Sequence, residues 1–242
     1  MVAIDHKGEV VVGILVEIYD DLGAFSALQG AFVEHQVMLQ KLSLKRKIVV
    51  VLVRTLEDLN LCDALIIPGG ESTTMAVLAR VSGLLEPLRE FVKTKPVWGT
   101  CAGAILLSQT IEGSKKGGQE LLGGISITTA RNGWGSQVES FEVDLSVEGL
   151  QNPEEFFTGI FIRAPVVLKL SPSPDDPPIQ VIARLPTDFL PPSLASLDEN
   201  DPKTVVALRQ GLHFLTTFHP ELTQDNRFHD YFVRECVLPR TA

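Results

Sequence analysis

The stretch from Pro96 to Leu107 reads PVWGTCAGAILL, and it decides the fold. Its first residues are apolar enough for a buried strand, and its last residues suit a helix. Between these parts, Gly99 and Gly103 stand two residues before and two residues after Cys101. Glycines at this spacing allow the strained turn that lifts a nucleophile above the edge of a sheet. The stretch therefore predicts a strand, a sharp turn and a helix whose free N-terminal amides favour the Cys101 thiolate.

Apolar runs alternate with amphipathic stretches through the first half of the chain. The apolar runs predict strands buried on both faces at Val10–Leu15, Ile48–Val53, Ala64–Ile67 and Pro96–Gly99. Apolar residues at helical spacing predict helices at Ala31–Leu42, Thr73–Leu78, Leu84–Val92 and Ala104–Gln109. This alternation predicts an α/β fold with a mostly parallel sheet and helices on both of its faces.

The second half has a different character. Ile125–Thr129 and Phe141–Leu145 alternate between apolar and polar residues, which predicts antiparallel additions to the sheet. Between Ser171 and Pro202 the chain carries eight of its 15 prolines, a density that excludes a helix across the segment. We expect a long surface loop there, interrupted by a short strand at Ile179–Leu185. With 242 residues, the chain fits a single domain that covers residues 1–242.

The composition favours a globular protein that acts on a small molecule or binds another protein. The net charge of -9 disfavours binding to nucleic acid or to an anionic membrane. The longest aliphatic run near the N-terminus, Ile48–Val53, is far shorter than the ~20 residues that cross a bilayer, and the first residues lack a secretion-signal pattern. Three cysteines, Cys62, Cys101 and Cys236, make no disulfide framework, so we expect a cytoplasmic protein.

The segment Phe218–Leu222 supplies the other parts of a nucleophilic site. Pro220 favours extended geometry at His219, and residues two apart in an extended segment point to the same side. Glu221 can therefore serve the same site as His219. The three residues fit a triad with Cys101 as nucleophile, His219 as base and then acid, and Glu221 as the group that holds the imidazole. The same residue types could ligate zinc, but no other ligand stands at metal spacing, so we expect no metal.

A glycine pair, Gly69-Gly70, follows the predicted strand Ala64–Ile67 at the edge where open parallel sheets place ligands. The backbone amides of Gly70 and Ala102 are the candidates for an oxyanion hole. Core or surface packing is the expected role of four further residues that could carry chemistry, namely His213, His229, Cys62 and Cys236.

Several further segments, spread over nearly the whole chain, resemble one family. In wording and order they are similar to the class I glutamine amidotransferases and, within these, to the glutaminase subunits of pyridoxal 5'-phosphate synthases. The Gly-Gly-Glu-Ser-Thr-Thr and Phe-Ile-Arg-Ala-Pro segments are much narrower signals than Gly-x-Cys-x-Gly alone. The segments are Leu28–His35, Pro68–Met75, Glu86–Phe91, Ala130–Gly135, Phe157–Gly159, Phe161–Pro165 and Phe218–Thr223.

The resemblance implies a flavodoxin-like class I glutaminase domain that hydrolyses L-glutamine to L-glutamate and ammonia through a cysteine thioester. It implies that the ammonia passes to a separate synthase subunit, which builds pyridoxal 5'-phosphate, and that the glutaminase needs no cofactor of its own. A carboxylate suits the ammonium of glutamine, and arginines suit its carboxylate. By the resemblance, glutamine would be held by Gly70, Glu71, Ser72, Arg131, Ile162 and Arg163.

Two segments depart from the family pattern as insertions, at about residues 16–27 and 171–202. The first would lie beside the active-site mouth and the surface that faces the synthase. One alternative is therefore a catalytically silent or impaired interaction module of the same fold that binds the synthase. A second alternative is a cysteine hydrolase or chaperone of related fold. Those proteins generally carry a histidine directly after the cysteine, where this chain has Ala102.

Overall fold

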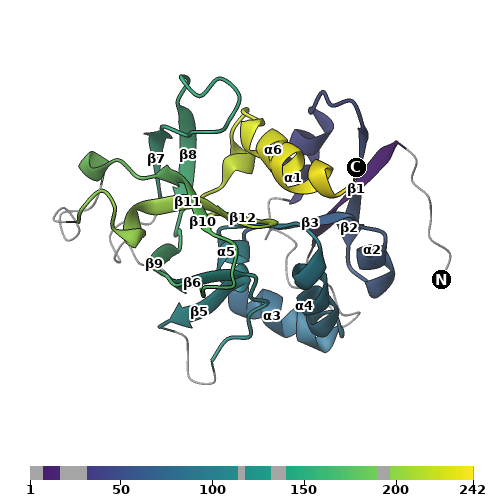
Figure 1. Cartoon of the computed structure of the whole chain (residues 1–242). Helices are drawn as coiled ribbons and strands as arrows, with labels where there is room; N and C mark the ends of the chain where they lie inside the picture. The colour runs from purple at the N-terminus through teal and green to yellow at the C-terminus, as the bar shows by residue number, and fades with distance from the viewer. Residues whose placement is uncertain (1–7, 17–31, 114–117, 132–139, 190–196, 242) are drawn as a thin grey trace.

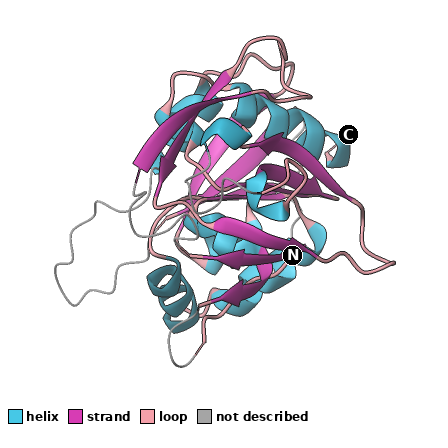
Figure 2. Cartoon of the chain, turned by 90° about the vertical axis from the view of Figure 1, so that its left-hand side faces the viewer, coloured by secondary structure: helices cyan, strands magenta, loops and turns pink. Residues whose placement is uncertain are grey.

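The computed structural model describes residues 8–16, 32–113, 118–131, 140–189 and 197–241. In these parts a central sheet separates two layers of helices, and two small sheets lie toward one end of it (Figure 1). The view at right angles shows the same layers, with helices on either side of the strands (Figure 2). The predicted α/β fold, with a mostly parallel sheet and helices on both faces, is confirmed.

Seven strands form the central sheet, in the order β10-β11-β12-β4-β3-β1-β2. The five strands from β12 to β2 are parallel, and β11 and β10 extend the sheet in antiparallel pairing. Their bounds are Glu9–Leu15 (β1), Lys47–Val53 (β2), Ala64–Ile67 (β3), Val97–Thr100 (β4), Ile179–Arg184 (β10), Val205–Gln210 (β11) and His213–Thr216 (β12). The carboxyl ends of β3, β4 and β12 therefore meet at one edge, where the candidate catalytic segments begin.

The helices cover both faces of this sheet (Figure 1). One layer holds α1 (Phe32–Gln40) and α6 (Arg227–Tyr231), and a π-helical turn at Phe232–Val237 continues α6. The other layer holds α2 (Leu56–Asn60), α3 (Ser72–Val81), α4 (Leu85–Thr94) and α5 (Ala102–Leu107). No helix in the described parts of the chain is long and apolar enough to cross a membrane.

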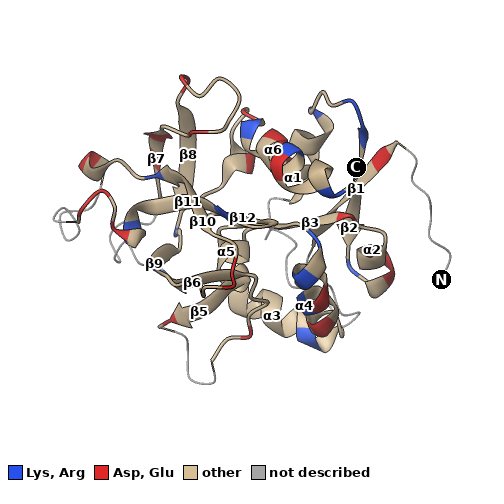
Figure 3. Ribbon diagram, in the orientation of Figure 1, with Lys and Arg blue, Asp and Glu red and all other residues tan. Residues whose placement is uncertain are grey.

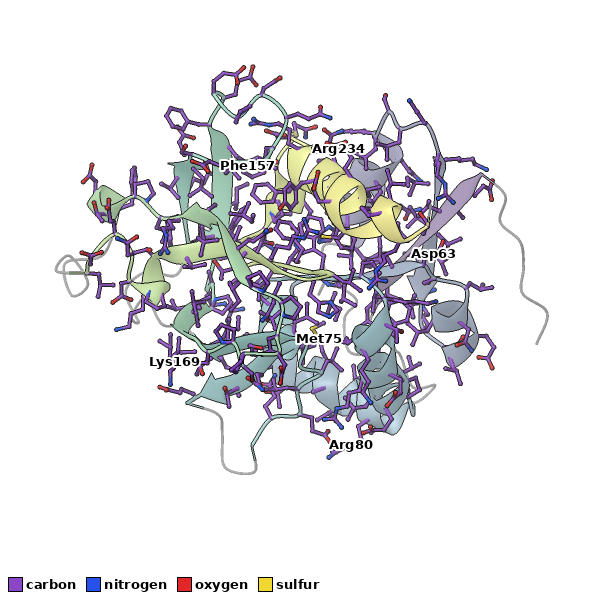
Figure 4. The ribbon with its side chains drawn as sticks, in the orientation of Figure 1. Asp63, Met75, Arg80, Phe157, Lys169 and Arg234 are labelled. Atoms are coloured by element: carbon purple, nitrogen blue, oxygen red, sulfur yellow. The ribbon has the colours of Figure 1, made fainter. Side chains whose placement is uncertain are left out.

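Alternation along the strands supplies two hydrophobic cores, one on each face. Val10 and Val12 of β1 pack into the core under α1 and α6, whereas Val11 packs into the core under α3, α4 and α5. Phe157, labelled in Figure 4, belongs to the first core and meets Phe228 of α6 with ring centroids 4.6 Å apart. The charged residues lie mainly outside the centre of the sheet (Figure 3). The central strands are thus held between two apolar layers, which keeps their carboxyl ends in fixed positions.

The observed strands correct three predictions, two in the small sheets and one in the central sheet. The sheet β5-β6-β9 comprises Ser108–Glu112, Ile125–Ala130 and Val166–Leu170, and the pair β7-β8 comprises Ser140–Leu145 and Phe157–Ile162. The antiparallel prediction is right for β7, but β6 is parallel to β5 and antiparallel only to β9. The helix predicted over Ala104–Gln109 ends at Leu107, because β5 begins at Ser108 and pairs with β6. The strand β2 is only partly buried, since it forms the edge of the central sheet.

The two predicted insertions are described to different extents. Residues 17–27 lie outside the described residues, so the insertion at 16–27 stays a prediction. The segment 171–202 contains the predicted short strand, as β10, and a 3-10 turn at Thr187–Phe189. Its residues 190–196 lie outside the described ones. The single domain over residues 1–242 likewise stays a prediction.

Candidate active site

Cys101 lies on a strained turn between β4 and α5. Its backbone has φ 48° and ψ −105°, and a positive φ is rare for a residue with a side chain. Its amide donates to the carbonyl of Thr216 at 3.0 Å, which fixes the turn to the end of β12. A Cβ atom on Gly103 would collide with the Ile67 carbonyl, and one on Gly99 would collide with the Gly103 backbone. Both glycines are therefore required for α5 to start so close to the sheet, as the Gly-x-Cys-x-Gly spacing predicts.

His219 follows β12, the strand that pairs in parallel with β4, so it reaches the same edge of the sheet as Cys101. Its amide donates to the Ile160 carbonyl at 2.8 Å. The chain then enters a 3-10 turn at Pro220–Leu222, which carries Glu221. Nδ1 of His219 lies 2.7 Å from Oε1 of Glu221, whose side chain is fully buried. The predicted His219–Glu221 contact is thus present.

His219 also interacts with Cys101. Burial by itself would lower the pKa of His219, but its hydrogen bonds with Cys101 and Glu221 and the charges of these two groups raise that pKa to about 10. Since Nδ1 faces Glu221, Nε2 is the nitrogen available to Cys101. This is the arrangement that a nucleophile needs when a base takes its proton and later returns it to a leaving group.

The glycine turn after β3 lies against the imidazole. A Cβ atom on Gly69 would collide with Cε1 of His219, so only glycine fits there. Gly70 has φ +155° and lies exposed at the same turn. Ala102 is the first residue of α5, so its amide has no partner within that helix. Gly70 and Ala102, the predicted oxyanion-hole residues, therefore lie in the turns that flank the site.

Glu71 and Arg131 come together in the structure, but most of their hydrogen bonds are made within the protein. Oε2 of Glu71 accepts from the amide and hydroxyl of Thr74, and Oε1 accepts from the Thr73 amide, so Glu71 caps the start of α3. Arg131 donates to Oε1 of Glu71 at 3.3 Å and to the Thr73 hydroxyl at 2.6 Å. Partial burial by itself would raise the pKa of Glu71, but the hydrogen bonds from Thr74 and Thr73 lower it to about 2. Glu71 therefore uses about four acceptor positions, the capacity of a carboxylate.

The other predicted substrate-binding residues are divided between two places. Ser72 is buried, and its hydroxyl donates to the side-chain oxygen of Gln119 at 3.3 Å. Ile162 lies at the end of β8, and its carbonyl lies 3.9 Å from the Cys101 sulfur. Arg163 is exposed and has a positive φ of 43°, as a residue in a tight turn at a functional edge can have. Ile162 thus lies at the nucleophile, with Arg163 beside it in the sequence.

Two buried histidines, His35 and His229, lie behind Glu221 in positions that the sequence does not predict. Nδ1 of His35, on α1, lies 2.8 Å from Nε2 of His229, on α6. Nε2 of His35 lies 3.5 Å from Oε2 of Glu221. His229 was expected only to pack, and His35 was noted only as part of a longer segment. One pattern in the sequence could have indicated that His35 is buried. His35 precedes Met38 by three residues and Leu39 by four, which is the spacing of one buried helix face.

The remaining candidates lie in the core, as expected. Cys62, Cys236 and His213 are buried, and burial raises the pKa of each of the two thiols to about 12. In the described part of the chain, no group of three or more His, Cys, Asp or Glu side chains is placed to hold a metal ion. The absence of a metal in the reaction stays a prediction.

Fold and site together define the class. The site combines a cysteine on a nucleophile elbow with a histidine and a glutamate, all at the carboxyl edge of a mostly parallel sheet. This combination is typical of a cysteine-dependent glutamine amidotransferase. The model of the SNO glutamine amidotransferase family matches residues 25–238. The chain belongs to this family.

Individual relatives agree with the family match. The "Probable pyridoxal 5'-phosphate synthase subunit PDX2" of Arabidopsis thaliana is 45% identical over 220 residues, which cover 86% of this chain and 83% of the relative. The "Pyridoxal 5'-phosphate synthase subunit PdxT" of Herpetosiphon aurantiacus is 43% identical over 208 residues, 86% of this chain and 96% of the relative. A crystal structure of a glutamine amidotransferase, 40% identical, superimposes with a TM-score of 0.68 over 92% of this chain and 97% of its own.

Proposed function

We propose that this chain is the glutaminase subunit of a pyridoxal 5'-phosphate synthase and hydrolyses L-glutamine to L-glutamate and ammonia at Cys101. The observation that carries the proposal is that Nδ1 of His219 lies 2.7 Å from Oε1 of Glu221 and that Cys101, on its strained turn, raises the pKa of the same imidazole. The relatives named as pyridoxal 5'-phosphate synthase subunits support the partner, a synthase subunit that consumes the ammonia.

The proposed reaction begins when the Cys101 thiolate attacks the side-chain amide carbon of glutamine. The amides of Gly70 and Ala102 stabilise the negative charge that develops on the amide oxygen. The His219 imidazolium then gives its proton to the leaving ammonia, and a thioester forms on Cys101. A water molecule, activated by His219, adds to the thioester carbon, and the release of glutamate restores the thiol. Glu221 keeps the imidazole oriented through both steps.

Substrate binding is proposed for Gly70, Glu71, Ser72, Arg131, Ile162 and Arg163. The geometry supports different roles within this set. Ile162 lies at the nucleophile, and the exposed Arg163 follows it in the chain, so the two suit direct contact with glutamine. Glu71 already holds Arg131 and caps α3, so an ammonium would reach it only by displacing one of its present donors. We assign to Glu71 the role of holding Arg131 and the turn at Gly70 in place.

The proposed location is the cytoplasm, where thiols remain reduced. Cys62, Cys101 and Cys236 are all free in the structure, and the reaction requires a free thiol at Cys101. Fractionation of cells that express the tagged chain tests this location.

The decisive experiment measures glutamate released from L-glutamine by the whole chain, with and without its cognate synthase subunit. We expect release that depends on Cys101 and increases when the synthase is present. The matched control is Cys236→Ala, which removes a thiol in the core and should leave the rate unchanged. A chain that binds the synthase but releases no glutamate would be the silent interaction module.

A further inference from the structure

Two fully buried histidines extend the polar chain beyond Glu221. His35 comes from α1 and His229 from α6, and neither side chain is exposed. Nδ1 of His35 lies 2.8 Å from Nε2 of His229. On the other side of the ring, Nε2 of His35 lies 3.5 Å from Oε2 of Glu221 and 3.4 Å from the hydroxyl oxygen of Thr100. The two rings therefore connect two helices to the carboxylate of the triad.

Glu221 uses only one of its oxygens to hold His219. Oε1 lies 2.7 Å from Nδ1 of His219, whereas Oε2 is buried and makes no hydrogen bond of ordinary length. A buried polar atom without a partner costs about 1–3 kcal/mol, and more when it is charged. Nε2 of His35 is the group that can serve this oxygen. Hydrogen bonds around a catalytic site are often long without substrate and shorten in the complex.

The hydrogen bond between the two histidines allows only two arrangements of protons. Burial lowers the pKa of both imidazoles to about 3, so each ring is neutral and carries one proton. In the first arrangement, Nε2 of His229 donates to Nδ1 of His35. The proton of His35 then lies on Nε2, facing Glu221, and Nδ1 of His229 is an acceptor.

In the second arrangement, Nδ1 of His35 donates to Nε2 of His229. Nε2 of His35 would then present a lone pair to the Glu221 carboxylate. Nδ1 of His229, which is buried and has no partner, would carry a proton with no acceptor. Buried N–H groups without acceptors are rare, whereas unused acceptor positions are less so. The contacts therefore select the first arrangement.

The rings are also held from the side by Trp98 of β4. The Trp98 ring meets His229 edge-on at 4.8 Å between centroids and His35 edge-on at 5.5 Å. The indole nitrogen itself donates to the Thr216 hydroxyl at 3.2 Å. The titratable groups around His35 are Glu221, His219 and His229. A proton on Nε2 of His35 has two oxygens near it, Oε2 of Glu221 at 3.5 Å and the Thr100 hydroxyl at 3.4 Å, and only the first is a carboxylate oxygen without a hydrogen bond.

We propose that His35, oriented by His229, is a positioning residue that donates from Nε2 to Oε2 of Glu221. Held at both oxygens, Glu221 keeps the orientation in which it aligns His219 with Cys101. This inference rests on the proposed glutaminase function. Its consequence is that α1 and α6, which contribute none of the reacting groups, set the geometry of the triad.

The first test does not need activity. Nitrogen NMR of the histidine rings in the whole protein at neutral pH reports which nitrogen carries each proton. We expect both His35 and His229 to be protonated at Nε2 and not at Nδ1. A proton on Nδ1 of His35 would overturn the proposal, because the ring would then have nothing to donate to Glu221.

The second test uses substitutions and measures glutamate release with the synthase subunit present. His35→Met removes the donor and should lower kcat by roughly 10- to 100-fold, less than the loss of a triad member, with KM within about twofold. His35→Gln places an amide N–H near the position of Nε2 and should recover most of that loss. His213→Met is the matched control, because it removes a different buried histidine at the opposite end of β12.

The third test asks whether His35 acts through Glu221. In the Glu221→Gln background, His35→Met should lower kcat by no more than about twofold, since residues of one unit act non-additively. A full second loss, or a loss of similar size in His213→Met, would show that His35 only supports the fold. If the unaltered protein releases no glutamate with its synthase, the proposed function fails, and the NMR result still decides the donor assignment.

Discussion

At the scale of single residues, Cys101 differs from the other thiols in its surroundings. It lies on a strained turn and raises the pKa of His219, whereas burial raises the pKa of Cys62 and of Cys236 to about 12. Only Cys101 should therefore react with an electrophilic glutamine analogue, and Cys101→Ala should abolish glutamate release while the protein stays folded. Mass spectrometry of the labelled protein checks the site. Label at either of the other cysteines would contradict the assignment.

His219 gives a pH prediction. Its pKa is raised from 6.5 to about 10, so the stabilisation from its ion pairs is fully present below pH 6.5 and is lost as the pH rises through about 10. In the unaltered protein, NMR titration should show that the His219 ring stays protonated well above pH 6.5. In Cys101→Ala the midpoint should move to lower pH, because one hydrogen bond that favours the charged ring is gone. A midpoint near 6.5 in the unaltered protein would contradict the arrangement.

The two arginines of the proposed substrate site give a kinetic prediction. A clamp on the substrate carboxylate binds ground state and transition state alike, so its loss changes KM more than kcat. Arg131→Ala and Arg163→Ala should each raise KM for glutamine, with kcat changed only a few-fold. Arg80→Ala, which removes an exposed arginine paired with Glu120 on the α3 surface, is the control and should change neither constant. An unchanged KM in both variants would show that neither arginine binds the substrate carboxylate.

At the scale of elements, local patterns were read correctly and long-range partners were not. The strands β1, β3 and β4 and the turn at Cys101 follow from apolar runs and glycine spacing, which are properties of the local sequence. The end of α5 at Leu107 does not follow from the spacing of apolar residues, because it depends on the pairing of Ser108 with Ile125 of β6. The contact between His35 and Glu221 joins residues 186 positions apart, and no sequence pattern reports such a contact. The capping role of Glu71 was hidden because glutamate is not a preferred cap.

The packing of α5 against β3 gives an element-scale prediction. A methyl group on Gly103 would collide with the backbone carbonyl of Ile67, which cannot move without disturbing the sheet. Gly103→Ala should therefore lower the free energy of unfolding by about 3 kcal/mol or more. Gly113→Ala is the control. Its φ of +69° is unfavourable for alanine, but a Cβ atom there would have none of the surrounding atoms within 4 Å. Its free energy of unfolding should therefore fall by only about 1 kcal/mol. Urea unfolding measures both, and equal losses would contradict the close approach.

At the scale of the whole molecule, the triad depends on three separate parts of the chain. Cys101 follows β4, the His219–Glu221 segment follows β12, and His35 stands on α1, whose first described residue is Phe32. The sheet fixes the first two relative to each other through the parallel pairing of β4 and β12. The third is held by the contacts of α1 with α6 and with the turn at Pro220–Leu222. The chain before α1 therefore leads into a helix that reaches the Glu221 carboxylate.

The segment at residues 16–27 precedes α1 and gives the last prediction. It lies outside the described residues except for Val16, whose amide closes the end of β1 by donating to the Val53 carbonyl at 3.2 Å. The segment departs from the family pattern as an insertion, so we expect that the shared fold does not require it. Added loop length costs only about 0.6 kcal/mol for each doubling, so its removal should not harm folding.

We expect that deletion of Val16–Ser26 leaves the free energy of unfolding similar or higher. We also expect it to increase the synthase-dependent release of glutamate, since the family resemblance implies that an insertion here adjoins the surface that faces the synthase. A deletion variant that unfolds, or that no longer binds the synthase, would show that the segment is an integral part of the protein.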